Sequence, residues 1–331
     1  MNTTYRYSFL AIILILIVAS VASAAGIGKD EFSRLLLVEK MLHQQIAEME
    51  GELKTSKQLE TYKKSYLAAI PKTSPRPTSD AQIAKTLASA RYVIMGDEHT
   101  TSQAQTNTVT VLSMMRASKE PLTLVLEWID ISYQNQVDEF LAGRLPLKDL
   151  RGKISFDKLW GFSWASYSKI LSAAKKLKTP ILLVERLKGN HSLADRDTFI
   201  TKTIAEHAKN APGMRYLVVY GDYHILGSGH LSDKMAKAGL KPQTILIGEA
   251  REVYWMLLGK LKDTEKIGFA QLGSGIYYIR NGTPLERSLS YRDYLMKMLG
   301  YSKDDFEEWV SPADIQPKAG GRNNFEALHN R

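Results

Sequence analysis

The sequence predicts an α/β fold in which helices flank a largely parallel central sheet. Five short apolar runs follow one another along the chain, and each ends in an acidic side chain. Continuous rather than alternating apolar runs are typical of strands covered on both faces, as in parallel sheets. Helical spacing of apolar residues separates these runs, at 102–117, 132–142, 164–178, 196–210 and 228–239. This alternation of strand and helix favours a parallel sheet.

Two of the runs end in the same motif, Gly-Asp-x-His. The first run is Arg91-Tyr-Val-Ile-Met-Gly-Asp-Glu-His99, and the second is Tyr216-Leu-Val-Val-Tyr-Gly-Asp-Tyr-His224. Side chains alternate along a strand, so an extended path through each motif would place its Asp and His on one side. We therefore expect Asp97 with His99, and Asp222 with His224, just beyond the ends of two strands.

The other three runs also end in acids, which are Glu127, Glu185 and Glu249. In open parallel sheets, ligands bind outside the carboxyl ends of the strands. The sequence therefore predicts a site at this edge, with Asp97, His99, Glu127 and His224 converging there. Glu185 and Glu249 also fit a second interpretation, as helix caps or ion-pair partners.

Composition excludes several classes of protein. The chain has 331 residues and is 44% apolar, enough for one main domain with a large core. Because it has no cysteine, disulfides, thiolate metal sites and cysteine nucleophiles are excluded. The net charge of +9 comes from scattered Lys and Arg without a nucleic-acid motif, which favours a solvated surface or contact with anionic lipid. Dinucleotide, phosphate-loop and serine-hydrolase motifs are absent from the sequence.

Residues 1–24 are typical of an export signal. Arg6 is their only charge, Phe9 to Val18 is apolar, and Ala22-Ser23-Ala24 fits a cleavage site. We expect the mature protein to begin near Ala25 and to be periplasmic or secreted. The alternative is an uncleaved membrane anchor, because the weakly polar run 9–27 approaches spanning length.

Four segments are expected along the chain. The signal peptide, 1–24, is followed by a helical segment and linker, 25–75, in which a helix runs from Asp30 to Leu67 and prolines then end it. The heptad spacing of its apolar residues also suits a partner helix, although packing on the main domain is favoured. The α/β domain, 76–310, ends with a hairpin at 268–279, and 311–331 is a polar tail.

An aromatic cluster precedes the third helical segment. It contains Trp160 and Trp164, beside Tyr167. Such rings can line a pocket for a flat ligand, or they can pack a loop against a helix.

Taken in order, these residues resemble the ChaN-like haem-binding uptake family, which is grouped with Tiki-type proteases and erythromycin esterases. The resemblance spans about residues 85 to 300. It is carried by Gly96-Asp-Glu-His99, Leu126-Glu127-Trp128, Gln136-Val-Asp-Glu-Phe-Leu-Ala-Gly143, Trp160-Gly-Phe-Ser-Trp164, Arg196-Asp197, Gly221-Asp-Tyr-His224 and His230-Leu231. Asp97 stands where the superfamily usually has Glu, and Glu98 is displaced by one. The resemblance implies an α/β fold with acids and histidines gathered at one sheet edge, and it implies haem or iron binding. It also implies that Arg196, at the start of a helix that leads to the His224 strand, converges on the same cleft.

Two functions remain open from the sequence. The first is an exported protein that binds a small molecule, haem or iron, with His99, Tyr223, His224 and His230 as candidate ligands. Its binding site would also include Glu98, Asp222, Trp160 and Trp164. A homodimer and a peripheral membrane contact are compatible with this function, and nucleic acid is not expected as a partner.

The alternative is a hydrolase that uses the same cluster. Acids and an imidazole base would activate water, directly or through a divalent metal bound by His99 and His224. Arg196 would stabilise an oxyanion. A third alternative is an envelope interaction module without such chemistry.

Overall fold

A computed structural model describes residues 29–52, 57–189, 191–258, 268–306 and 309–315. The chain forms two compact units. The larger comprises 55–250 and 268–281, and the smaller comprises 1–54, 251–267 and 282–331. The predicted signal peptide, the alternative anchor and most of the predicted tail lie outside the described residues. Among the described residues, none belongs to a helix with the length and apolarity needed to span a membrane.

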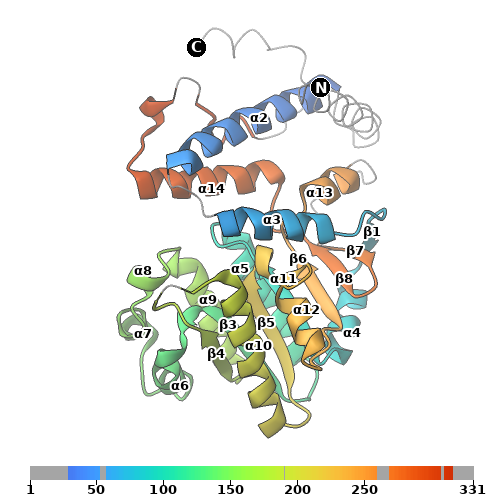
Figure 1. The fold of residues 1–331 in the computed structure, drawn as a ribbon, viewed down its shortest axis with the longest axis vertical. Coiled ribbons are helices and arrows are strands. Elements are labelled where there is room, and N and C mark those ends of the chain that lie inside the picture. The colour runs from blue at the N-terminus through green and yellow to red at the C-terminus, as the bar shows by residue number, and fades with distance from the viewer. Residues whose placement is uncertain (1–28, 53–56, 190, 259–267, 307–308, 316–331) are drawn as a thin grey trace. The chain divides into compact units, whose positions relative to one another are not determined.

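The larger unit is built on one eight-stranded sheet, in the order β1-β7-β8-β6-β2-β5-β3-β4 (Figure 1). The strands are β1 Arg76–Thr78, β2 Tyr92–Asp97, β3 Leu122–Asp130, β4 Ile181–Glu185, β5 Arg215–Gly221, β6 Thr244–Ile247, β7 Phe269–Gly273 and β8 Ile276–Ile279. Strands β8, β6, β2, β5, β3 and β4 pair in parallel, whereas β7 pairs antiparallel with β8 and with β1. The predicted α/β class, the largely parallel sheet and the C-terminal hairpin are confirmed.

Ten helices accompany this sheet within the described residues. They are α3 Lys57–Ala69, α4 Asp80–Ser89, α5 Ser102–Arg116, α6 Gln134–Leu141, α7 Leu147–Lys153, α8 Phe156–Leu159, α9 Trp164–Lys176, α10 Leu193–Asn210, α11 Asp222–Ile225 and α12 Leu231–Lys237. Helix α5 packs on α4 and α9, and α10 packs on α12. Figure 1 shows α10 and α12 on the viewer's side of the sheet and α4 behind it. Helices on both faces explain why β2, β3 and β5 are buried along their whole lengths.

The two motif strands lie side by side and in register. Strand β2 pairs with β5 from Tyr92 opposite Tyr216 to Asp97 opposite Gly221. Because the strands are parallel, both Gly-Asp-x-His motifs emerge at the same edge of the sheet.

The smaller unit has its own core, formed mainly by α2 Lys29–Glu52 and α14 Pro284–Leu299, and it also contains α13 Arg251–Leu258. The heptad face of α2 is buried against α14, with Leu35 and Leu42 in one apolar cluster with Leu285 and Leu289. The two helices run parallel, since hydrogen bonds join His43 to Ser288, Gln45 to Arg292 and Glu52 to Tyr301. The apolar spacing of α2 therefore reflects packing within the chain.

Three local predictions differ from the structure. The single helix expected from Asp30 to Leu67 is divided into α2 and α3, in different units. The proline linker contributes β1, an edge strand in which Pro77 needs no ladder donor. The second motif turns into helix α11 immediately after Gly221, so the extended path expected there is wrong.

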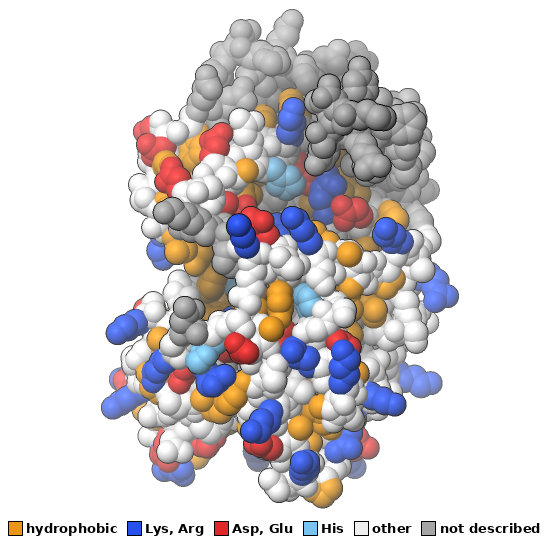
Figure 2. Space-filling model, in the orientation of Figure 1, with side chains coloured by type: hydrophobic (Ala, Val, Ile, Leu, Met, Phe, Trp, Pro, Cys, Tyr) orange, Lys and Arg blue, Asp and Glu red, His pale blue; other side chains and the backbone are white. Residues whose placement is uncertain are grey.

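Charged side chains are mixed over the surface. Figure 2 shows Lys, Arg, Asp and Glu interspersed over the face it presents, in keeping with the scattered charge of the sequence.

Candidate functional site

Asp97 orients His99. The imidazole Nδ1 lies 3.0 Å from Asp97 Oδ2, and the same oxygen accepts a 2.6 Å hydrogen bond from the Tyr167 hydroxyl. Gln105 Nε2 donates to Asp97 Oδ1 at 2.7 Å. Asp97 is buried, so its carboxylate holds the ring with Nδ1–H donating and leaves Nε2 on the opposite side. Burial and the charge of Asp97 raise the pKa of Tyr167, which keeps its hydroxyl a donor.

The Nε2 side of His99 faces a carboxylate and aromatic rings. Nε2 lies 4.0 Å from Glu127 Oε2, and 27% of the His99 side chain is exposed. The ring centroids of Trp160 and Phe162 lie 4.7 and 5.2 Å from that of His99. A Cβ at Gly221 would lie 3.1 Å from Nε2, so a side chain there would crowd the His99 ring. Trp160 therefore lies beside His99 at this edge of the sheet.

His99 has a raised pKa. Burial opposes its charge, but the hydrogen bond to Asp97, the charge of Asp97 and then that of Glu127 raise the pKa of His99 above its usual value. The imidazolium is therefore stabilised by buried carboxylates on both of its sides.

Arg196 joins two buried acids at the strand ends. Its Nη2 lies 2.7 Å from Glu127 Oε1, 3.0 Å from Glu185 Oε2 and 3.1 Å from the Tyr220 hydroxyl. Glu127 Oε2 accepts the Gly221 amide at 2.6 Å. Burial raises the pKa of Glu185, and Arg196 opposes that effect. Since Nη2 already serves three partners, Arg196 acts here mainly to position Glu127.

His224 forms a second carboxylate–imidazole pair. Its Nδ1 lies 2.6 Å from Asp197 Oδ1, and Asp197 is completely buried. The Tyr62 hydroxyl donates to Asp197 Oδ2 at 3.3 Å, and the Tyr220 ring lies 4.9 Å from the His224 ring. Because Arg196 and Asp197 are consecutive on α10, this helix contacts both Glu127 and His224. The structure thus gathers Asp97, His99, Glu127, Arg196 and His224 at one edge.

Asp222 is directed away from His224. Its Oδ1 accepts the Gly248 amide at 3.0 Å and the Tyr66 hydroxyl at 3.3 Å. The helical turn of α11 causes this, because residues two apart on a helix do not share a face. Asp222 therefore fastens α11 to the end of β6 and to α3.

The remaining predicted binding residues lie around this edge at different places. His230 Nδ1 lies 2.8 Å from the Tyr223 carbonyl oxygen, and its ring stacks on Tyr62 with centroids 4.3 Å apart. Burial lowers the pKa of His230. Trp164 packs edge-on against Phe156 at 5.0 Å instead of meeting His99. Glu98 follows Asp97, and its backbone carbonyl accepts from Gln105 at 3.3 Å.

Sequence reasoning missed several supporting residues. Asp197 directly follows Arg196, and Tyr167 lies three residues after Trp164, so the neighbouring sequence pointed to both. Gln105 and Tyr62 had none, because they reach the site from α5 and α3 through the folding of the chain. In the described part of the chain, no group of three or more His, Asp or Glu side chains is arranged to hold a metal ion.

Comparisons with known proteins bear on the part of the chain that contains His99. Residues 83–184 match the family model described as haem-binding uptake, Tiki superfamily, ChaN. No curated protein matches the chain significantly.

Several solved structures are similar at low identity. ChaN of Campylobacter jejuni, solved with cofacial haem binding, is 14% identical with a TM-score of 0.40, covering 61% of this chain and 92% of that one. The type III effector HopBA1 is 12% identical with a TM-score of 0.39, covering 54% and 86% of the two chains. The family match confirms the resemblance predicted from the sequence: residues 83–184 are similar to the ChaN-type haem-binding uptake proteins of the Tiki superfamily.

Proposed function

We propose that this protein binds haem as a cargo, with His99 as the iron ligand. The observation that carries the proposal is the orientation of the His99 ring. Its Nδ1 is held by buried Asp97, and its Nε2 faces the opposite side, beside aromatic rings. Imidazole is a common axial ligand of haem iron. His99 and its aromatic neighbours lie within residues 83–184, the segment matched by the haem-binding family.

The residues present fit haem by their chemistry. A carboxylate on the second ring nitrogen fixes the tautomer of a ligating histidine and strengthens it as a donor. Trp160 and Phe162 offer flat apolar surface of the kind that a porphyrin face contacts. His99 would therefore hold the iron, and these two rings would contact the porphyrin.

The experiment is a haemin titration of the full chain, followed by the Soret absorbance. His99→Ala should weaken haemin binding at least about tenfold, the effect of losing roughly 1.4 kcal/mol. His43→Ala is the matched control, since it removes an exposed histidine of the smaller unit. Circular dichroism checks that both variants fold. Equal haemin affinity in His99→Ala and the parent chain would contradict the proposal.

A second candidate function is hydrolysis, and a specific observation favours it. Two imidazoles, His99 and His224, each have Nδ1 fixed by a buried Asp at the same sheet edge. Protonated His99 could act as a general acid, while His224 accepts a proton from water. Chromogenic esters test this candidate: hydrolysis should be lost in both His99→Ala and His224→Ala. Full ester turnover in His224→Ala would count against hydrolysis while leaving the haem proposal standing.

We also propose that the chain is exported and begins near Ala25 after cleavage. The apolar segment followed by Ala22-Ser23-Ala24 supports this proposal. N-terminal sequencing of the exported protein should give a start near Ala25. An intact Met1 form embedded in membrane would favour the anchor in its place.

A further inference from the structure

A surface depression of about 470 Å³ lies at the edge of the sheet opposite to the histidines. It is lined by the last residues of helices α5 and α9 and by the residues that follow them, before strands β3 and β4. The depression therefore lies at the amino ends of those strands. Its charged lining consists of basic residues, which are Arg116, Lys119, Lys176 and Lys178. We propose that this depression binds an anionic phosphate group.

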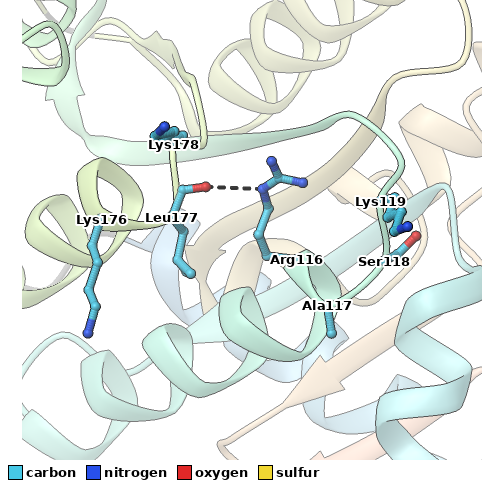
Figure 3. Close-up of a pocket in the computed structure, with 7 residues that line it drawn as sticks. All are labelled: Arg116, Ala117, Ser118, Lys119, Lys176, Leu177 and Lys178. Atoms are coloured by element: carbon cyan, nitrogen blue, oxygen red, sulfur yellow. Dashed lines mark hydrogen bonds between the residues drawn. The ribbon is translucent and has the colours of Figure 1, made fainter.

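Arg116 is held so that part of its guanidinium remains available. Its Nε donates to the Leu177 carbonyl oxygen at 3.1 Å. Figure 3 shows this bond, with the terminal nitrogens of Arg116 pointing beyond it and with Lys119 and Lys178 on either side. A guanidinium fixed through one nitrogen presents a pre-organised fork, which suits the oxygens of phosphate.

Acidic side chains do not neutralise this cluster. In the described part of the chain, Arg116, Lys119, Lys176 and Lys178 form no ion pair within 4.0 Å, and adjacent Glu120 instead pairs with Arg215 at 3.7 Å. Without acidic partners, the positive charge of Arg116, Lys119 and Lys178 is available to a bound anion.

The helix dipoles explain only part of the cluster. Arg116 and Lys176 lie in the last turns of α5 and α9, where cations are favourable in any helix. Lys119 and Lys178 lie beyond those helices, so this explanation does not cover them.

Lys178 supplies a second, independent observation. Its amide donates to the Lys175 carbonyl and the next amide donates to Ala174, which together form the C-terminal cap of α9. Lys178 has φ of 51°, in the left-handed region, where such caps usually have glycine. The backbone gives no reason for lysine here, so a role of its side chain in the depression is the better explanation.

The test compares the parent chain with two double variants of the full chain. All three proteins have the same N-terminus. Lys119→Gln/Lys178→Gly removes two charges from the depression, and glycine suits the backbone at 178. Lys64→Gln/Lys202→Gln removes two exposed charges from α3 and α10 and serves as the control. Inorganic pyrophosphate is titrated by calorimetry at low ionic strength. Sedimentation with phosphatidylglycerol and with phosphatidylcholine vesicles is measured in parallel.

We expect binding to weaken about fivefold for each charge removed from the depression, the effect of roughly 1 kcal/mol per basic residue. The control should bind like the parent chain. Loss of pyrophosphate binding identifies a soluble phosphate, whereas loss confined to phosphatidylglycerol vesicles identifies a lipid headgroup. The proposal is overturned if the parent chain binds neither probe, or if both double variants weaken binding equally. Thermal melting should show the depression variant to be at least as stable as the parent.

Discussion

Under the proposed function, Asp97 sets the pH range in which His99 would bind iron. Because Asp97 and Glu127 raise the pKa of His99, the ring stays protonated to higher pH than an ordinary histidine. A protonated imidazole has no lone pair for iron, so we expect haemin affinity to increase as pH rises through the pKa of His99. The stability contributed by this pairing has the opposite sign: it is full below the unfolded pKa and is lost as pH rises through the folded pKa.

Asp97→Asn should therefore move the haemin-binding curve to lower pH, since it removes the largest source of the raised His99 pKa. The Soret titration is repeated between about pH 5 and 8, where histidine titrates. Asp149→Asn, which changes an exposed acid on α7, should leave the curve unchanged. An identical midpoint in Asp97→Asn and the parent chain would refute this coupling.

Gly96 is required by the close approach of Asp222. A Cβ at Gly96 would lie 2.1 Å from Asp222 Oδ1, an oxygen already bound to the Gly248 amide. Gly96→Ala should lower the free energy of unfolding by about 1–3 kcal/mol, because the buried carboxylate must move. Gly152→Ala is the matched control: it has nothing within 4 Å and should gain about 0.5–1 kcal/mol in helix α7. Urea denaturation should show a lower free energy of unfolding in Gly96→Ala and a higher one in Gly152→Ala. Equal values for Gly96→Ala and the parent chain would contradict this role of Gly96.

Helices α4 and α5 depend on one arginine of β5 for their C-terminal caps. Arg215 donates to the carbonyl oxygens of Leu87 at 2.5 Å, Ala90 at 3.0 Å and Met115 at 3.1 Å. The guanidinium is buried, so its removal leaves three carbonyls without this donor.

Arg215→Met should therefore cost about 2–4 kcal/mol in the free energy of unfolding, since hydrogen bonds to charged groups contribute more than neutral ones. Lys209→Met, at an exposed position near the end of α10, controls for loss of charge. Chemical denaturation measures both variants. An Arg215→Met protein as stable as the control would show that water replaces the cap.

At the scale of elements, the strands could be predicted and the second motif could not. Continuous apolar runs identified β2 to β6, because a strand that is buried on both faces needs apolar residues at nearly every position. The two motifs read alike, yet only the second becomes helical at once. The reason is not local: Glu127 of β3 accepts the Gly221 amide, and Asp222 caps the amide of Gly248 beyond β6.

The candidate site shows the same limit across the whole molecule. Its acids and histidines could be placed at one edge because parallel strands end together, and β2 and β5 are in register. The sequence placed Asp97 beside His99, but it did not predict the contacts of Tyr167 and Gln105, which hold Asp97 from two separate helices. The orientation of His224 could not be predicted, since it depends on Asp197 of α10. The order of strands and motifs in the sequence therefore predicts which edge of the sheet carries the site. Packing between distant elements decides which ring nitrogen of His99 and of His224 faces an aspartate carboxylate.

The chain forms two cores from separate sets of residues, although it passes between its two units four times. Leu42 lies in the core of α2 and α14, and Leu124 lies in the core around the sheet; both are fully buried. Replacing either leucine with alanine should cost about 2–5 kcal/mol locally. Because cooperative units unfold with their own free energies, the two losses should appear in different amides.

Hydrogen exchange separates the two effects. Leu42→Ala should speed exchange in α2 and α14 while the amides of β2, β3 and β5 keep their protection. Leu124→Ala should show the reverse pattern, and each variant thus controls for the other. If Leu42→Ala deprotected the central strands as strongly as its own helices, the chain would unfold as one cooperative whole. The proposed haemin site would then lose stability with any large core change, wherever that change lies.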